Sequence, residues 1–170
     1  MAVRRARTSI LVSLAALSCA PSVGDPIDGT ISGTVVKGPV AGSSVQAFSV
    51  SPGGRRDAAV GRGKTDAGGG FTLNLAGHFG TTLVCARGGA FTEEATGGLV
   101  DLGPNELCAL IDAQELGGAT SGAVLTPLTT LHANLTACLI EAGREQDLQA
   151  ASDRAANRLN QFLSAGTPSF

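Results

Sequence analysis

Hydrophobic and polar residues alternate in short runs over residues 29–112, which is the pattern of β-strands that bury one face. In the run FTLNL, for example, every second residue is apolar. Clusters of glycine, proline, serine and aspartate separate the runs, as turns require. The pattern predicts a mainly β fold, a seven-stranded antiparallel sandwich. The expected strands are residues 30–38, 44–50, 58–65, 71–75, 81–88, 98–102 and 106–112.

The period changes after Gly122, where apolar residues recur every three or four positions. This spacing predicts a C-terminal helical hairpin with helices at about 126–142 and 145–164. Thr126 before Pro127 fits a helix N-cap, and Gly143 fits a helix end. The residues expected on the buried face of the first helix are Leu128, Leu131, Leu135, Leu139 or Cys138, and Ala142.

The N-terminal segment has the arrangement of a signal peptide. Arg4, Arg5 and Arg7 precede an apolar run of eight residues, Ile10–Leu17. Such a run spans about 12 Å as a helix, far short of a hydrocarbon core of about 30 Å. The arginines directly before the run argue against a buried N-terminal helix. Residues 1–18 are therefore expected to be a signal peptide rather than a transmembrane helix.

The cleavage site indicates a lipoprotein. The sequence ALSC, ending at Cys19, resembles a bacterial lipobox, although Ala16 stands where leucine is usual. Cleavage after Ala20 by an ordinary signal peptidase is the alternative, but Pro21 would then follow the cut and block that enzyme. Cys19 is thus the expected lipid-attachment residue, and its acyl chains would hold the protein at a membrane. Residues 19–28 would form a tether.

Charge and composition disfavour nucleic acid as a partner. Loss of residues 1–18 removes three of the 12 basic residues and none of the 14 acidic ones, which moves the formal charge from −2 to −5. Nucleic-acid binding needs a basic surface. The chain also has no Trp or Tyr and only six Phe, so aromatic stacking on bases or sugars is poorly supplied.

Three cysteines follow Cys19, and they leave two alternatives open. Cys85 and Cys108 lie in neighbouring predicted strands and can form a disulfide in an oxidising compartment, leaving Cys138 over. Closure of that loop would add roughly 3 kcal/mol of stability. The other alternative is that all three are small buried hydrophobic residues. The chain has no CxxC motif, which argues against zinc and thioredoxin-like chemistry.

The stretch AAVGRGKTDAGGGF, Ala58–Phe71, matches a relaxed nucleotide-binding pattern. A phosphate-binding loop of that kind needs a helix directly after the threonine. Here Asp66 and three consecutive glycines follow Thr65, and each glycine costs about 1 kcal/mol in a helix. We therefore expect a hairpin turn, with Asp66 accepting hydrogen bonds from backbone amides of the turn.

Other candidate sites in the sequence are weak. His78 and His132 lie in different predicted elements without metal-ligand spacing. Glu93 and Glu94 form an acidic pair that fits calcium or a partner, but a solvated loop is the favoured interpretation. The serines of AGSSV form no nucleophile elbow and have no matching His–Asp set. The sequence thus predicts no catalytic residue, metal or cofactor, and a protein that is not an enzyme.

Several short motifs, in order, resemble one family. They are GTVVKGPVAGSSVQAFSV, KTDAGGGFTLNL, ARGGAFTEEATG and TPLTTLH. Together they resemble the transthyretin-like, carboxypeptidase-regulatory-like β-sandwich of secreted bacterial lipoproteins, over about residues 29–135. Phe91 stands where that family often has tyrosine. The resemblance implies a fold of the transthyretin-like or immunoglobulin-like kind and a location, but no conserved chemistry.

These observations lead to one expectation of function and one alternative. The first is a lipid-anchored, non-enzymatic protein at the periplasmic or outer-membrane face of a Gram-negative envelope, which binds an envelope protein or glycan. The alternative is an accessory module of a secreted peptidase or carbohydrate-active system. The expected division of the chain is a signal peptide at 1–18, a tether at 19–28, a β-sandwich at 29–113 and a helical segment at 114–170.

The lipoprotein prediction can be tested by intact mass after expression of the full chain in a Gram-negative host. Because Cys19 would become the acylated first residue, we expect the membrane-fraction protein to have the mass of residues 19–170 plus a diacylglyceryl group and an N-acyl chain. A soluble chain that still carries Met1 would contradict this prediction.

Overall fold

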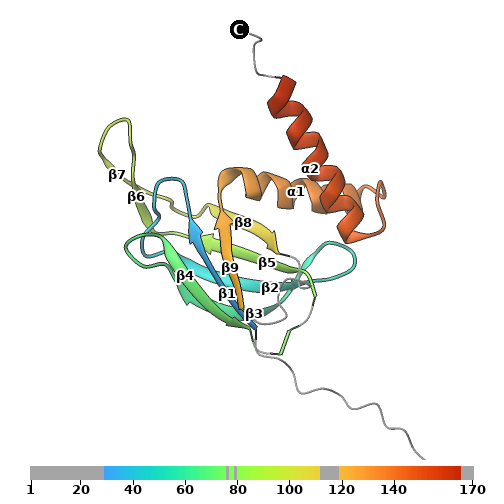
Figure 1. Cartoon of the computed structure of the whole chain (residues 1–170), viewed down its shortest axis with the longest axis horizontal. Helices are drawn as coiled ribbons and strands as arrows, with labels where there is room; N and C mark the ends of the chain where they lie inside the picture. The colour runs from blue at the N-terminus through green and yellow to red at the C-terminus, as the bar shows by residue number, and fades with distance from the viewer. Residues whose placement is uncertain (1–28, 76, 79, 112–118, 166–170) are drawn as a thin grey trace, which may run out of the picture.

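The computed structural model describes residues 29–75, 77–78, 80–111 and 119–165 (Figure 1). The predicted signal peptide, Cys19 and the tether lie outside the described residues. In the described part, nine strands precede two helices. The elements are β1 (Gly29–Val35), β2 (Ser44–Val50), β3 (Arg56–Lys64), β4 (Gly70–Leu75), β5 (Thr82–Arg87), β6 (Ala90–Thr92), β7 (Leu99–Asp101), β8 (Glu106–Ile111), β9 (Ala119–Leu125), α1 (Pro127–Glu141) and α2 (Leu148–Ala165).

The strands form two larger sheets and one small one. One sheet has the order β4-β1-β9, and the other has the order β3-β2-β5-β8. Strands β6 and β7 pair separately as a short hairpin. Paired strands are antiparallel except β1 and β9, which run parallel. In Figure 1 the three-stranded sheet lies over the four-stranded one, with β1 and β9 in front of β2 and β5.

The two larger sheets share one buried core, because the alternation of apolar residues turns one face of each sheet inward. On β2, for example, Val45 and Ala47 are completely buried, whereas Ser44, the first residue of the strand, is exposed. The buried residues from the two sheets are Ile31, Val35, Phe71, Leu73, Leu75 and Leu125 on one side, and Val45, Ala47, Val84, Ala86, Leu107, Ala109 and Ile111 on the other.

The fold is mainly β with a C-terminal helical hairpin, but the expectation of seven strands in one antiparallel sandwich was wrong. Strands β6 and β9 were not anticipated. β6 has only three residues, and β9 (ATSGAVL) lacks a regular alternation of apolar and polar residues. β9 pairs with β1, which is distant in the sequence, and a local pattern of residues does not predict such pairing. Strand β9 also lies within residues 114–170, the range expected to be helical.

A β-bulge lets β9 approach β1 closely. The register shifts between Ser32 and Gly33, and the extra residue on β9 is Gly122, whose φ is +91°. A Cβ at Gly33 would lie 2.1 Å from the Ala123 carbonyl oxygen. Glycine is therefore required at residue 33 by steric contact, and it is favoured at residue 122 by backbone conformation.

Helix α1 begins and ends where the sequence predicted. Thr126 is the N-cap, its hydroxyl accepts from the Thr129 N–H at 3.1 Å, and Pro127 is the first helical residue. At the other end, the N–H groups of Gly143 and Arg144 donate to the carbonyls of Ile140 and Leu139. With φ of +63° at Gly143, this is a Schellman motif.

The buried face of α1 matches the expected one only in part: Leu139 is buried and Leu135 packs partly buried beside it, as expected. Ala133, Thr136 and Leu139 are buried, whereas Leu128 and Leu131 are about half exposed. The small Ala133 side chain permits close packing. The buried Thr136 hydroxyl has a hydrogen-bond partner, because it donates to the His132 carbonyl at 2.9 Å. Periodicity therefore identified the helix but only part of the face that it buries.

The two helices pack as a hairpin through small residues. Ala151 and Ala155 of α2 are completely buried against Leu139. The His132 ring nitrogen Nε2 lies 3.0 Å from the Ser152 carbonyl oxygen, which adds a polar contact between the helices. Within the described residues, no helix is both long enough and apolar enough to cross a membrane.

Replacement of Phe71 by alanine tests the shared core. Phe71 is 5% exposed and belongs to the buried cluster, so Phe71→Ala should lower the free energy of unfolding by about 3–5 kcal/mol in a denaturant titration. Leu99→Ala is the control, because Leu99 is 77% exposed on β7. Equal effects of the two substitutions would contradict the core assignment.

Candidate functional site

The candidate site is the outer face of the four-stranded sheet, defined as the side turned away from the shared core. Side chains alternate along each strand, so the residues between the core positions lie on this face. Residues directly opposite in paired strands share a face, and this extends the assignment across the sheet. The outer face of β2, β5 and β8 consists of Ser44, Gln46, Phe48, Leu83, Cys85, Arg87, Glu106, Cys108 and Leu110.

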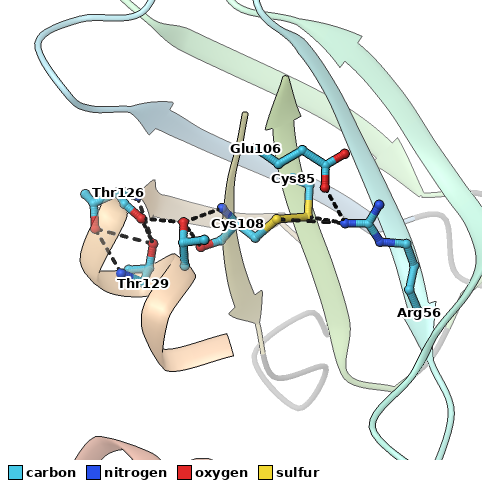
Figure 2. Close-up of a disulfide and its surroundings, with 7 residues drawn as sticks. Arg56, Cys85, Glu106, Cys108, Thr126 and Thr129 are labelled. Atoms are coloured by element: carbon cyan, nitrogen blue, oxygen red, sulfur yellow. Dashed lines mark hydrogen bonds and ion pairs between the residues drawn. A yellow bond between two sulfur atoms is a disulfide. The ribbon is translucent and has the colours of Figure 1, made fainter. Parts of the chain in front are cut away.

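A disulfide joins β5 to β8 at the centre of the outer face (Figure 2). Cys85 and Cys108 are directly opposite each other, with Cα atoms 4.1 Å apart. The Cys108 N–H points away from β5, because it donates to the Thr130 hydroxyl at 2.8 Å. The two cysteines therefore occupy a non-hydrogen-bonded pair position, where the Cα atoms of antiparallel strands come closest.

Arg56, at the start of β3, reaches over the disulfide to β8 (Figure 2). Its Nη2 atom donates to Glu106 Oε2 at 2.8 Å and lies 3.1 Å from Cys85 Sγ and 3.9 Å from Cys108 Sγ. Its guanidinium carbon lies 4.4 Å from the centre of the Phe48 ring. The guanidinium thus contacts an aromatic ring, a carboxylate and a disulfide sulfur at once.

Helix α1 covers the free edge of β8 through Thr130. The Thr130 hydroxyl accepts from the Cys108 N–H and donates to the Thr126 carbonyl at 2.7 Å. An uncovered edge strand would leave such backbone groups unpaired. The contact therefore links the helix to the same residue that carries the disulfide.

One group of potential metal-ligand atoms is found among the described residues. It consists of the sulfur atoms of Cys85 and Cys108 and a carboxylate oxygen of Glu106, which lie within 4.8 Å of one another. Cysteine binds metals as a thiolate, whereas both sulfurs here belong to a disulfide. Arg56 also brings a positive charge to the same atoms. The arrangement does not fit a metal ion.

Basic side chains surround this centre. Lys64 and Arg62 on β3 are opposite Ser44 and Gln46, so they share the outer face, as does Arg87 on β5. Arg62, Lys64 and Arg87 are exposed and make no ion pair with any residue in the described ranges. Glu106, which lies opposite Arg87, pairs with Arg56 instead, so these three residues give the outer face a local excess of positive charge.

Two cavities flank the disulfide. One, of about 460 Å³, is lined by Ser44, Gln46, Phe48, Cys85, Arg87 and Glu106, among others. The other, of about 360 Å³, lies between α1 and the start of β3, and Cys108, Arg56 and Thr130 contribute to its wall. Each sulfur of the disulfide thus belongs to a residue that lines a different cavity.

The nucleotide-like stretch forms the predicted turn but not a β-hairpin, because β3 and β4 belong to different sheets and do not pair with each other. β3 leads into a turn and then into β4, with no helix after Thr65. Asp66 Oδ1 accepts from the N–H groups of Gly68 and Gly70, both at 2.8 Å. Lys64 faces solvent on an edge strand. The glycines therefore serve the turn and do not surround a phosphate.

The histidines and acidic residues singled out from the sequence are not brought together. His78 lies in the loop between β4 and β5, and His132 lies on α1. Glu93 belongs to the loop between β6 and β7, where its carboxylate accepts from the Thr96 hydroxyl at 2.8 Å. Neither Glu93 nor Glu94 belongs to a cluster of three potential metal ligands in the described part of the chain.

The remaining serines and cysteines have structural surroundings. Ser43 is buried, and its hydroxyl donates to the Gly88 carbonyl. Ser44 is exposed on β2. Cys138 is a free thiol on the exposed side of α1, not on a buried face as its spacing suggested. Cys19 lies outside the described residues.

The Arg56–Glu106 contact was missed at the level of sequence. The two residues are 50 positions apart, and Arg56 precedes the strand expected at 58–65. Their meeting depends on the strand order β3-β2-β5-β8, which no local pattern contains. The one available hint was that Glu106 and Arg56 border the strands that carry Cys108 and the basic residues of β3.

Comparisons with known proteins assign no family. No protein-family model matches the chain, and no curated protein matches it. Among solved structures, a 9R-lipoxygenase from Cyanothece is 12% identical with a TM-score of 0.35, over 84% of this chain and 27% of the lipoxygenase. A DUF3823 family protein from Parabacteroides merdae is 14% identical with a TM-score of 0.36, over 59% of this chain and 47% of that protein. The chain thus spans less than half of either structure, and no functional argument follows from them.

Proposed function

We propose that this protein is a lipid-anchored, non-enzymatic protein of the Gram-negative cell envelope whose outer sheet face binds an acidic glycan. The residues before and at Cys19 support the anchor, and the short motifs that resemble transthyretin-like lipoproteins support the β-sandwich assignment and the location. The outer face supports the choice of partner. A glycan that bears carboxylates or phosphates would complement it.

The local excess of positive charge on the outer face carries this proposal. Arg62, Lys64 and Arg87 are exposed there without an ion pair among the described residues, although the chain as a whole has a formal charge of −2. A local excess of cations on a net acidic protein creates an electrostatic preference for anionic partners. Charges on neighbouring strands, about 5 Å per strand apart, can meet successive acidic groups of a polymer.

The cavity of about 460 Å³ supports a sugar as the unit that is bound. Arg87 offers a guanidinium for a carboxylate or phosphate, and Ser44 and Gln46 offer hydroxyl and amide groups for sugar hydroxyls. Phe48 supplies apolar contact in the same wall. This combination of a concave surface and a few convergent polar groups is typical of small-molecule sites.

Binding to polygalacturonate, a carboxylated polysaccharide, tests the proposal by isothermal titration calorimetry on the detergent-solubilised full chain. We expect measurable binding that weakens as salt rises from about 0.05 to 0.5 M, because exposed charges are screened. Neutral dextran should not bind. The double substitution Arg62→Glu with Arg87→Glu should reduce affinity at least about tenfold.

Arg158→Glu serves as the matched control, because Arg158 is exposed on α2, away from the outer sheet face. Its change of charge, −2, equals that of each single substitution, Arg62→Glu or Arg87→Glu, and it should leave affinity unchanged. Equal loss of binding in both variants, or equal binding of dextran and polygalacturonate, would contradict a specific site on the outer face.

A further inference from the structure

We propose that the Cys85–Cys108 disulfide is a thiol–disulfide exchange site, which a dithiol reductant attacks at Cys108 and which releases Cys85 as a thiolate. The proposal goes beyond glycan binding and does not depend on it. It rests on the position of Arg56 beside one sulfur, on the pairing of Arg56 with Glu106, and on the separate cavities that Cys85 and Cys108 line.

The guanidinium makes the two sulfurs unequal. Arg56 Nη2 lies 3.1 Å from Cys85 Sγ but 3.9 Å from Cys108 Sγ. A nearby cation favours a thiolate over a thiol, and a stabilised thiolate is the better leaving group in thiol–disulfide exchange. Negative charge that develops on Cys85 as the S–S bond breaks is therefore better compensated than charge on Cys108.

The two cysteines also differ in the cavity through which a reductant can reach them. Cys85 is 3% exposed and Cys108 is 7% exposed, so neither sulfur meets bulk solvent widely. Cys108 lines the cavity of about 360 Å³ beside α1, whereas Cys85 lines the other one. The cavity beside α1 therefore offers a thiolate an approach to Cys108, with Cys85 as the sulfur that leaves.

The exchange balances in two steps. The first thiolate of the reductant forms a bond to Cys108 Sγ, the Cys85–Cys108 bond breaks, and its electron pair leaves with Cys85 as a thiolate beside Arg56. The second thiol of the reductant loses its proton and attacks its own sulfur in the mixed disulfide. The bond to Cys108 then breaks, and Cys108 takes up a proton. The reductant leaves as its disulfide, and the protein gains two electrons. Counted from the neutral dithiol, one proton passes to solvent, and it is the proton lost when the first thiol ionised.

Glu106 opposes the effect of Arg56 on the sulfur. Its carboxylate shares the Nη2 donor at 2.8 Å and neutralises part of the guanidinium charge. Removal of the carboxylate charge should therefore leave the guanidinium freer to stabilise Cys85 as a thiolate. The two members of one ion pair are thus predicted to change the reduction rate in opposite directions.

The test measures reduction of the disulfide by dithiothreitol in the full chain that carries Cys138→Ser, which removes the exposed free thiol of α1. Samples are quenched with acid over time, alkylated, and analysed by peptide mass spectrometry at Cys85 and Cys108. We expect Arg56→Gln to slow reduction by about threefold or more and Glu106→Gln to accelerate it. Arg56→Lys retains a positive charge and should restore part of the rate.

General loosening of the site would accelerate reduction in both variants, because each breaks the same ion pair. Acceleration by Arg56→Gln in a variant that melts at the parental temperature, or a change of the same sign in both variants, would overturn the proposal. If Arg56→Gln does not fold, the Glu106→Gln rate decides alone: faster reduction at an unchanged melting temperature supports the proposal, and an unchanged or slower rate refutes it.

Discussion

The antiparallel pairing of β5 with β8 determines which side chains face the core and which face solvent on half of the four-stranded sheet. In this register Val84 and Ala86 point inward opposite Ala109 and Leu107, and Cys85 meets Cys108 on the outer face. The disulfide holds that register, because a slip of one residue would exchange the two faces. The core, the contact with α1 and the cluster around Arg56 all depend on this pairing.

The same pairing brings together chemistry from distant parts of the chain. Arg56 comes from β3, Glu106 from β8, and Thr130 from the helix that follows β9. The outer face therefore combines a covalent link, an ion pair and a cover for the edge strand within one neighbourhood. Its surroundings are basic in a chain that is acidic overall. The proposal of an acidic glycan as partner depends on this contrast.

Local sequence pattern predicted the parts of the fold that depend on neighbouring residues. The alternation in FTLNL, the Asp66 turn, the Thr126 cap and the Gly143 helix end are all present, because each is determined by a few adjacent side chains and backbone angles. β6 was too short to be recognised, and β9 forms through its parallel pairing with β1. Part of the buried side of α1 likewise depended on packing, not on periodicity.

The site was only partly predictable for the same reason. The spacing of Cys85 and Cys108 placed them in adjacent strands, but the sequence left open whether they were bonded. The positions of Arg56 and Glu106 beside predicted strands did not indicate that they meet, since strand order decides their contact. Charge counted over the whole chain also concealed the basic outer face, because opposite charges elsewhere outnumber it.

Disulfide mapping of the purified full chain by non-reducing peptide mass spectrometry tests the central claim most directly. The account predicts that Cys85 is bonded to Cys108 and that Cys138 is a free thiol. A bond from Cys138 to either of the other two cysteines, or three free thiols in the folded protein, would contradict the register of β5 and β8 as the basis of the outer face.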